Sequence, residues 1–158
     1  MLSMTRKTDY ALVALTHLAK RGGRVSAREL ANRLGLPVPA LMNILNQLGR
    51  AGLVVSTRGP SGGYGLAMPA SEITLADLIE AVEGRVRLTL CCSEEGEEFS
   101  RRCDLESDCA VKEPVRKVHA LLRQFLSGVT IEQIAMNRVP VQLGMNGNPA
   151  VECVHTPV

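Results

Sequence analysis

The chain has few aromatic residues and no long apolar run. Its 158 residues include no tryptophan, two phenylalanines and two tyrosines, although 46% of them are hydrophobic. This apolar content is sufficient for a packed core, which must therefore be aliphatic. No stretch reaches the roughly 18 apolar residues of a membrane span, and the N-terminus lacks the basic, apolar and cleavage regions of a signal peptide. We expect a cytoplasmic protein with no membrane partner.

A strong excess of charge is also missing, because the formal net charge is only +2. The two halves of the chain nevertheless differ. Residues 1–69 carry nine basic and two acidic side chains, whereas the remainder carries nine basic and fourteen acidic ones. A basic half beside an acidic half is typical of a protein in which one part meets a polyanion.

The basic half has the pattern of three short helices. The first is expected over about 7–20. The second begins after Ser26, which can form a capping box with Glu29, and it stops at Gly35. The third covers about 39–51, because a proline suits the first turn of a helix.

The third helix has two distinct faces. Leucine and isoleucine recur at helical spacing and predict a buried stripe, formed by Leu41, Ile44, Leu45 and Leu48. Amide and guanidinium groups follow the same spacing on another face, at Asn43, Asn46, Gln47 and Arg50. Such groups pair with base edges and phosphates.

A β-hairpin is expected next, with strands near 53–57 and 64–68 around a tip rich in glycine and proline. Three helices followed by a basic-tipped hairpin predict a winged helix-turn-helix on double-stranded DNA, with the third helix in the major groove. Glycines at the tip would let the backbone approach a phosphate. The candidate DNA-binding residues are Arg28, Pro39, Asn43, Asn46, Gln47, Arg50, Arg58, Gly59, Ser61, Gly62 and Gly63.

The second half predicts three more helices. One is capped by Thr74 and ends at Gly84, a long one runs from about 109 or 113 to 127, and a short one starts at Thr130. The long helix has a narrow apolar stripe typical of helices that pair lengthwise, made of Val115, Val118, Leu122 and Phe125. We therefore expect a homodimer.

The predicted fold class is mainly α with a small β-hairpin wing, and the long helix is the dimerisation element. The expected division has three parts. Residues 1–70 form the DNA-binding domain, and 71–138 carry a linker helix, the cysteine loop and the dimerisation helix. Residues 139–158 form a flexible tail, since they show no clear hydrophobic period.

Four of the five cysteines lie within residues 91–109, a segment with little apolar content: Cys91, Cys92, Cys103 and Cys109. In a reducing compartment such a group indicates metal binding or redox chemistry rather than disulfides. Thiolates are the usual ligands of iron–sulphur clusters. Zinc is an alternative, although close ligand pairs two to four residues apart are missing, and reversible thiol oxidation is another. No adjacent base is evident for a catalytic cysteine, so we do not expect an enzyme.

Several motifs together resemble the bacterial iron–sulphur regulators of the IscR and NsrR type, and most closely the regulators of SUF cluster-assembly operons. They are "TRKTDYAL", then "RGPSGGY" with Cys91 27 positions after its tyrosine, then Cys103 and Cys109. The resemblance covers about residues 3–138. It implies a dimeric winged-helix repressor of cluster-assembly or redox and nitrosative stress genes, with a [2Fe-2S] or [4Fe-4S] cluster. Asp9 stands where NsrR-like members supply a carboxylate from the partner subunit.

The sequence departs from the IscR pattern at several points. Ten or eleven residues separate Cys103 from the preceding cysteine, and only the gap from Cys103 to Cys109 is five. Lys112 stands where IscR has a histidine. The candidate metal ligands are therefore Cys91 or Cys92, Cys103, Cys109 and Asp9. A zinc- or thiol-dependent winged-helix regulator or protein-binding adaptor is the alternative function.

Overall fold

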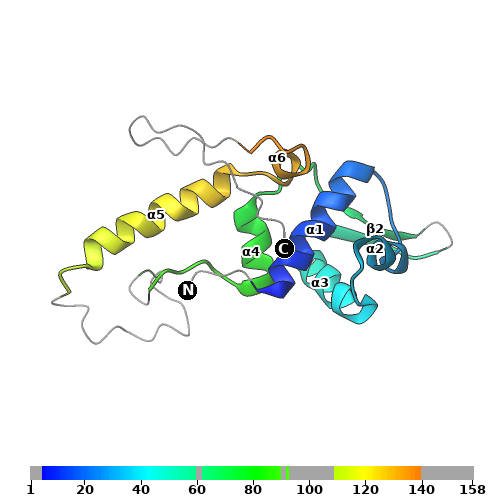
Figure 1. The fold of residues 1–158 in the computed structure, drawn as a ribbon, viewed down its shortest axis with the longest axis horizontal. Coiled ribbons are helices and arrows are strands. Elements are labelled where there is room, and N and C mark those ends of the chain that lie inside the picture. Colours follow the sequence, from blue (N-terminus) through cyan, green and yellow to red (C-terminus); the bar gives the residue numbers. More distant parts are fainter. Residues whose placement is uncertain (1–4, 60–61, 90–91, 93–108, 140–158) are drawn as a thin grey trace, which may run out of the picture.

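The computed structural model describes residues 5–59, 62–89, 92 and 109–139. This part of the chain is mainly helical with one two-stranded antiparallel sheet (Figure 1), as predicted. The elements are α1 (Arg6–Arg21), α2 (Ala27–Leu34), α3 (Val38–Arg50), β1 (Val54–Thr57), β2 (Gly63–Leu66), α4 (Leu75–Glu83), α5 (Lys112–Gly128) and α6 (Ile131–Ala135). The predicted fold class is confirmed, and the element boundaries differ from the expected ones by a few residues.

Side-chain caps fix where α4 and α6 begin. Thr74 accepts a hydrogen bond from the backbone N–H of Asp77, whose carboxylate accepts one from the N–H of Thr74. Thr130 and Gln133 form the same reciprocal pair at α6. The two helix starts are joined, since the Ile131 N–H donates to the Ile73 carbonyl at 2.8 Å. The N-terminal ends of α4 and α6 are therefore held side by side by backbone pairing.

The capping box expected at Ser26 is only half formed. The hydroxyl of Ser26 accepts from the N–H of Glu29 at 3.1 Å. The Glu29 carboxylate instead lies 3.3 Å from Arg21 Nη1 and 3.4 Å from Arg33 Nε. Two nearby guanidinium groups outcompete one backbone N–H for the carboxylate, so Glu29 links α2 to the end of α1.

The core is aliphatic, as the composition predicts, and α1 passes through its centre. In Figure 1, α2 and α3 lie on one side of α1, and α4 and α6 lie on the other. The stripe predicted on α3 is buried in the same cluster, and α3 contacts α1, α2 and α4. The largest fully buried apolar side chains are Leu15, Leu18, Leu30, Leu41, Leu45, Leu48, Ile73, Leu78, Ile131 and Val25. This single cluster extends across residue 70, the expected boundary between the first two parts of the chain.

Glycines in the hairpin serve internal packing. Val25 pairs with the edge of β2, because its N–H donates to the Tyr64 carbonyl at 2.9 Å and its carbonyl accepts from the Tyr64 N–H at 2.8 Å. A Cβ atom on Gly63 would lie 2.6 Å from the Val25 carbonyl oxygen. A Cβ atom on Gly62 would collide with the backbone of Thr57. Both glycines thus have a structural role independent of any phosphate.

The long helix α5 projects away from the rest of the fold (Figure 1) and contacts α4. Its 17 residues span about 25 Å. The predicted stripe divides in two. Leu122 packs against the core, whereas Val118 and Phe125 are 56% and 39% exposed. Arg123 Nη2 lies 3.7 Å from Glu80 Oε1 of α4, which supports the orientation of α5.

Two further expectations concern the ends of the chain and membranes. Nearly all of the tail expected at 139–158 lies outside the described residues. None of the helices in the described ranges combines the length and apolarity needed to cross a bilayer.

Candidate nucleic-acid interface and cysteine segment

Because the apolar stripe of α3 is buried in the core, the polar face of this helix is turned toward solvent. Asn43, Asn46 and Arg50 are exposed and Gln47 is half-buried. Pro39 is exposed in the first turn, where its fixed φ suits the start of a helix. The structure therefore brings together on one surface all five α3 residues predicted to bind DNA.

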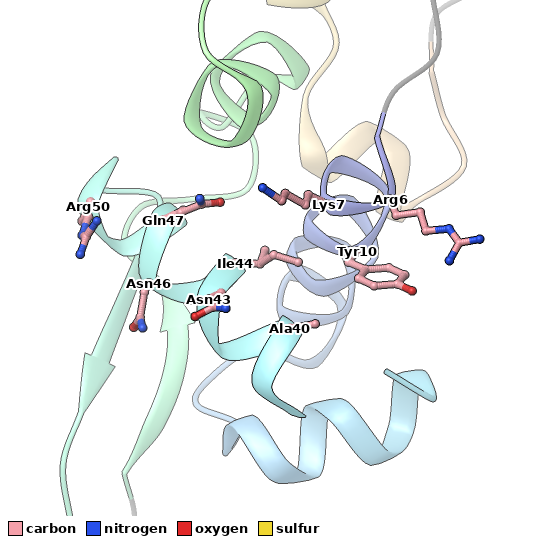
Figure 2. Close-up of a pocket in the computed structure, with 9 residues that line it drawn as sticks. All are labelled: Arg6, Lys7, Tyr10, Ala40, Asn43, Ile44, Asn46, Gln47 and Arg50. Carbon is pink, nitrogen blue, oxygen red and sulfur yellow. The ribbon is translucent and has the colours of Figure 1, made fainter. Parts of the chain in front are cut away.

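This face borders a groove of about 400 Å³ between α1 and α3 (Figure 2), with Ile44 at its base. The α1 side consists of Arg6, Lys7 and Tyr10. Lys7 and Gln47 point toward each other across the groove, while Arg6 points away from α3. The sequence predicts that Arg6 and Lys7 belong to the basic half of the chain but does not place them at the interface. Two basic residues directly after the cap Thr5 were the available signal.

A second groove, of about 620 Å³, lies between the end of α3 and the hairpin. Asn46 and Arg50 line both grooves, and Ser56 and Tyr64 contribute from the strands. The polar face of α3 is thus open on its two long sides. A surface of this form can accept a polymer that runs past the helix.

The remaining candidate DNA-binding residues flank α3. Arg28 is exposed on α2. Arg58 and Gly59 are exposed beyond the end of β1. Ser61 lies outside the described residues. These basic groups lie on elements separate from α3, as phosphate contacts commonly do around a recognition helix.

Three of the five candidate metal ligands can be placed. Cys109 is a half-buried free thiol just before α5, and its carbonyl accepts from the Lys112 N–H at 3.2 Å. Cys92 is also a half-buried free thiol, with its Sγ 3.3 Å from the Thr89 hydroxyl. Asp9 is exposed in the first turn of α1. Cys91 and Cys103 lie outside the described residues.

Within the described ranges, no three His, Cys, Asp or Glu side chains gather closely enough to hold a metal ion. The whole segment contains four thiols and few apolar residues. This composition suits ligation of an iron–sulphur cluster better than packing into a hydrophobic core. Cys92 and Cys109 are not paired in a disulfide and are half-buried, and ligation by thiolate requires such unpaired cysteines.

A carboxylate at the end of α4, eight positions before Cys91, is joined to the start of α1. Glu83, the last residue of α4, accepts hydrogen bonds through Oε1 from the hydroxyl of Thr5, from the hydroxyl of Thr8 at 2.5 Å and from the N–H of Thr5 at 3.3 Å. Thr8 is fully buried. These bonds, chiefly from the Thr5 hydroxyl, hold the pKa of Glu83 below its usual value of 4.5. We name Glu83, Thr5 and Thr8 the α1–α4 junction.

We predict that Glu83→Gln lowers the melting temperature at neutral pH, because a neutral amide accepts these bonds more weakly. A depressed carboxyl pKa contributes stability above the unfolded-state pKa and loses it as pH falls through the lower folded-state value. The difference between wild type and variant should therefore be constant above about pH 5 and shrink below pH 4.5. Calorimetry across this range measures it, with Glu72→Gln as the control. A pH-independent difference would contradict the electrostatic assignment.

Comparisons with known proteins agree with this architecture. Residues 4–137 match the Rrf2 family, described as iron-dependent transcriptional regulators. The chain belongs to the Rrf2 family. The regulator IscR of Photorhabdus laumondii is 32% identical over 139 residues, covering 87% of this chain and 81% of that protein.

Two solved structures extend the comparison. T. potens IscR is 28% identical with a TM-score of 0.65, covering 92% of this chain and 94% of that one. CymR, the global cysteine regulator of B. subtilis, is 27% identical with a TM-score of 0.66, covering 87% and 98%. The predicted resemblance to the IscR type is confirmed. The chain is a transcriptional regulator of the Rrf2 family rather than an enzyme, as expected.

Proposed function

We propose that this Rrf2 regulator is a homodimeric DNA-binding repressor whose affinity for its operator depends on an iron–sulphur cluster. The cluster-assembly or redox and nitrosative stress genes are its proposed targets. The observation that carries the proposal is the concentration of four thiols in the segment joining α4 to α5. The same chain presents an open polar face on α3. In this proposal, the sensing and DNA-reading parts adjoin each other in one polypeptide.

The proposed ligands are Cys103, Cys109 and one of Cys91 and Cys92, with the partner's Asp9 as the fourth. The cluster, when bound, supplies iron–thiolate bonds that are sensitive to oxidants and to iron shortage. The chain's own contribution is to hold Cys109 directly before α5, through its carbonyl's hydrogen bond with Lys112, and Asp9 in the first turn of α1. A polar segment of this kind gains its order from ligation.

The α1–α4 junction gives a physical route from this segment to DNA. The stretch that leads to this segment leaves α4 after Glu83, whose carboxylate accepts hydrogen bonds from Thr5 and Thr8 at the start of α1. Arg6 and Lys7, between those threonines, line the groove beside α3. A shift of the segment would therefore move basic groups at the reading surface. Couplings between sites of this kind are usually about 1–3 kcal/mol.

The exposed face of α5 is the basis for the proposed homodimer. Val111, Val118 and Leu121 are 60%, 56% and 60% exposed, and Phe125 extends the same line at helical spacing. Water does not favour such a continuous apolar strip on a projecting helix. A second copy pairing along α5 would cover it and present two α3 helices to two half-sites.

The test is anaerobic purification followed by iron, acid-labile sulphide and zinc analysis, visible spectroscopy and binding to promoter fragments before and after cluster removal. We expect iron and sulphide in equal amounts and an affinity that changes on removal. Colourless protein after reconstitution, or equal affinity in both states, would overturn cluster dependence. Zinc without sulphide would establish the zinc alternative.

Arg58→Ala should weaken DNA binding about equally on all sequences, because a wing arginine contacts phosphate rather than base edges. The slope of log affinity against log salt should become shallower by about one for each phosphate that the variant no longer neutralises. Fluorescence anisotropy at several salt concentrations measures this. Arg138→Ala, which removes an exposed arginine after α6, is the matched control and should leave the slope unchanged. Equal effects of the two variants would remove Arg58 from the interface.

A thiol-based regulator without a cluster is the second candidate, favoured by the similarity to CymR, the global cysteine regulator of B. subtilis. Reversible oxidation of the segment's cysteines would then alter affinity. Peroxide and reductant should switch DNA binding of iron-free protein under this alternative, and should leave it unchanged if the cluster is the sensor. The protein-binding adaptor is not retained, because the family consists of transcriptional regulators.

In this proposal, residues 1–70 bind DNA, residues 71–138 sense and dimerise, and residues 139–158 form a tail. The proposed compartment is the cytoplasm, where thiols stay reduced and DNA is accessible.

A further inference from the structure

We infer that the exposed face of α3 selects half-sites rich in A·T pairs by direct reading in the major groove. This inference rests on the proposed DNA binding and adds the chemical class of base that the helix recognises. It follows from which functional groups the fold leaves exposed on α3 and from which groups are missing there.

The residues of α3 (Val38–Arg50) include no acidic side chain and a single basic one, Arg50, at the last position. The first turn offers Pro39 and Ala40. One turn further, Met42 is 42% exposed beside the exposed amide of Asn43. The exposed part of the helix therefore presents hydrocarbon and carboxamide groups before its final residue.

Each class of side chain favours one base edge in the major groove. Asparagine and glutamine pair in bidentate fashion with adenine N6 and N7, and apolar groups contact the thymine methyl. Arginine and lysine favour guanine, and carboxylates favour cytosine. Recognition helices contact bases mainly through their N-terminal residues. The groups that α3 presents in its first two turns are those suited to adenine and thymine.

The competing possibility is recognition of guanine by one of three cationic side chains near the groove. Arg50 lies at the end of α3 and also lines the groove beside Ser56 of the hairpin, a position suited to phosphate. Arg6 points away from α3, and Lys7 reaches toward Gln47 from α1. Lys7 is the cation that could reach a guanine edge. Its alanine variant belongs in the experiment for this reason.

Selection from a random duplex library with the full-length protein tests the inference first. We expect enriched half-sites in which A·T pairs predominate at the positions facing α3, with Lys7→Ala leaving that preference unchanged. Enrichment of G·C pairs at these positions would overturn the inference. So would enrichment that shows no base preference.

Base analogues then test which groove of the DNA is read and which functional groups of the bases are recognised. An inosine·cytosine pair has the minor-groove pattern of A·T but the major-groove pattern of G·C, so replacing A·T by it should weaken binding as much as G·C does. Uracil in place of thymine removes only the methyl group and should also weaken binding. Inosine·cytosine binding as tightly as A·T would show reading of the minor groove or of DNA shape and would overturn the inference.

Asn43→Ala should lower discrimination between A·T and G·C at one position by about 5- to 150-fold, while retaining most of the affinity for nonspecific DNA. Gln124→Ala, which removes an exposed amide from α5, is the control and should retain full discrimination. Unchanged discrimination in Asn43→Ala and in Gln47→Ala would contradict the assignment. Absence of salt-dependent binding to any duplex would instead refute the proposed function itself, so the two failures differ.

Discussion

Replacing Cys109 with alanine is expected to abolish the visible absorption of the protein purified without oxygen. Cys109 is a half-buried thiol directly before α5, and a cluster normally needs four ligands. The fold should survive, because the contact that Cys109 makes with Lys112 uses its backbone carbonyl. Circular dichroism should therefore be unchanged while iron and sulphide fall to background.

The matched control is Cys153→Ala, which removes the one cysteine outside residues 91–109 and should keep full colour. Single replacements of Cys91 and Cys92 would then show which of the two is a ligand. Full colour in Cys109→Ala, or equal loss in Cys153→Ala, would contradict the proposed ligand set.

A charge placed on the exposed strip of α5 is expected to separate the dimer. Val118→Glu introduces a carboxylate at a position that is 56% exposed in the single chain and buried in the proposed dimer, where desolvation strongly opposes an unpaired charge. Operator affinity should fall by about two orders of magnitude or more, because simultaneous binding to two half-sites is lost. Sedimentation and anisotropy titrations measure the two effects.

Ala120→Glu is the matched control, since Ala120 is exposed on α5 and lies on a different face from Val118 at helical spacing. It should remain dimeric with unchanged affinity. A dimeric Val118→Glu protein would exclude the α5 strip as the interface, while loss of the dimer in both variants would indicate general damage to the helix.

Much of the fold follows from local chemistry. Thr74 and Thr130 were predicted to start helices and do so with complete capping boxes, because a cap needs only residues three positions apart. The two faces of α3 follow from helical periodicity, and the structure buries the predicted stripe. The aliphatic core likewise reflects composition, since few aromatic residues are available to fill it.

Other features depended on neighbours that capping and periodicity rules do not identify. Glu29 was expected to reach back to Ser26 but binds Arg21 and Arg33. That Gly62 and Gly63 let the backbone approach a phosphate stays a prediction. An added Cβ atom would meet the backbone of residues 57–59 at Gly62 and the backbone of Val25, in another segment, at Gly63. Local sequence patterns do not predict which other groups come close to a residue in the folded chain.

The sequence by itself determined the helices, the polar face of α3 and the collection of thiols between α4 and α5, because capping, periodicity and composition act over a few neighbouring residues. Only the tertiary structure placed Arg6 and Lys7 beside that face and joined Glu83 to Thr5 and Thr8. Those contacts join positions more than 30 residues apart. They arise when α1, α3 and α4 bury their apolar faces together, so packing of the whole core decides them.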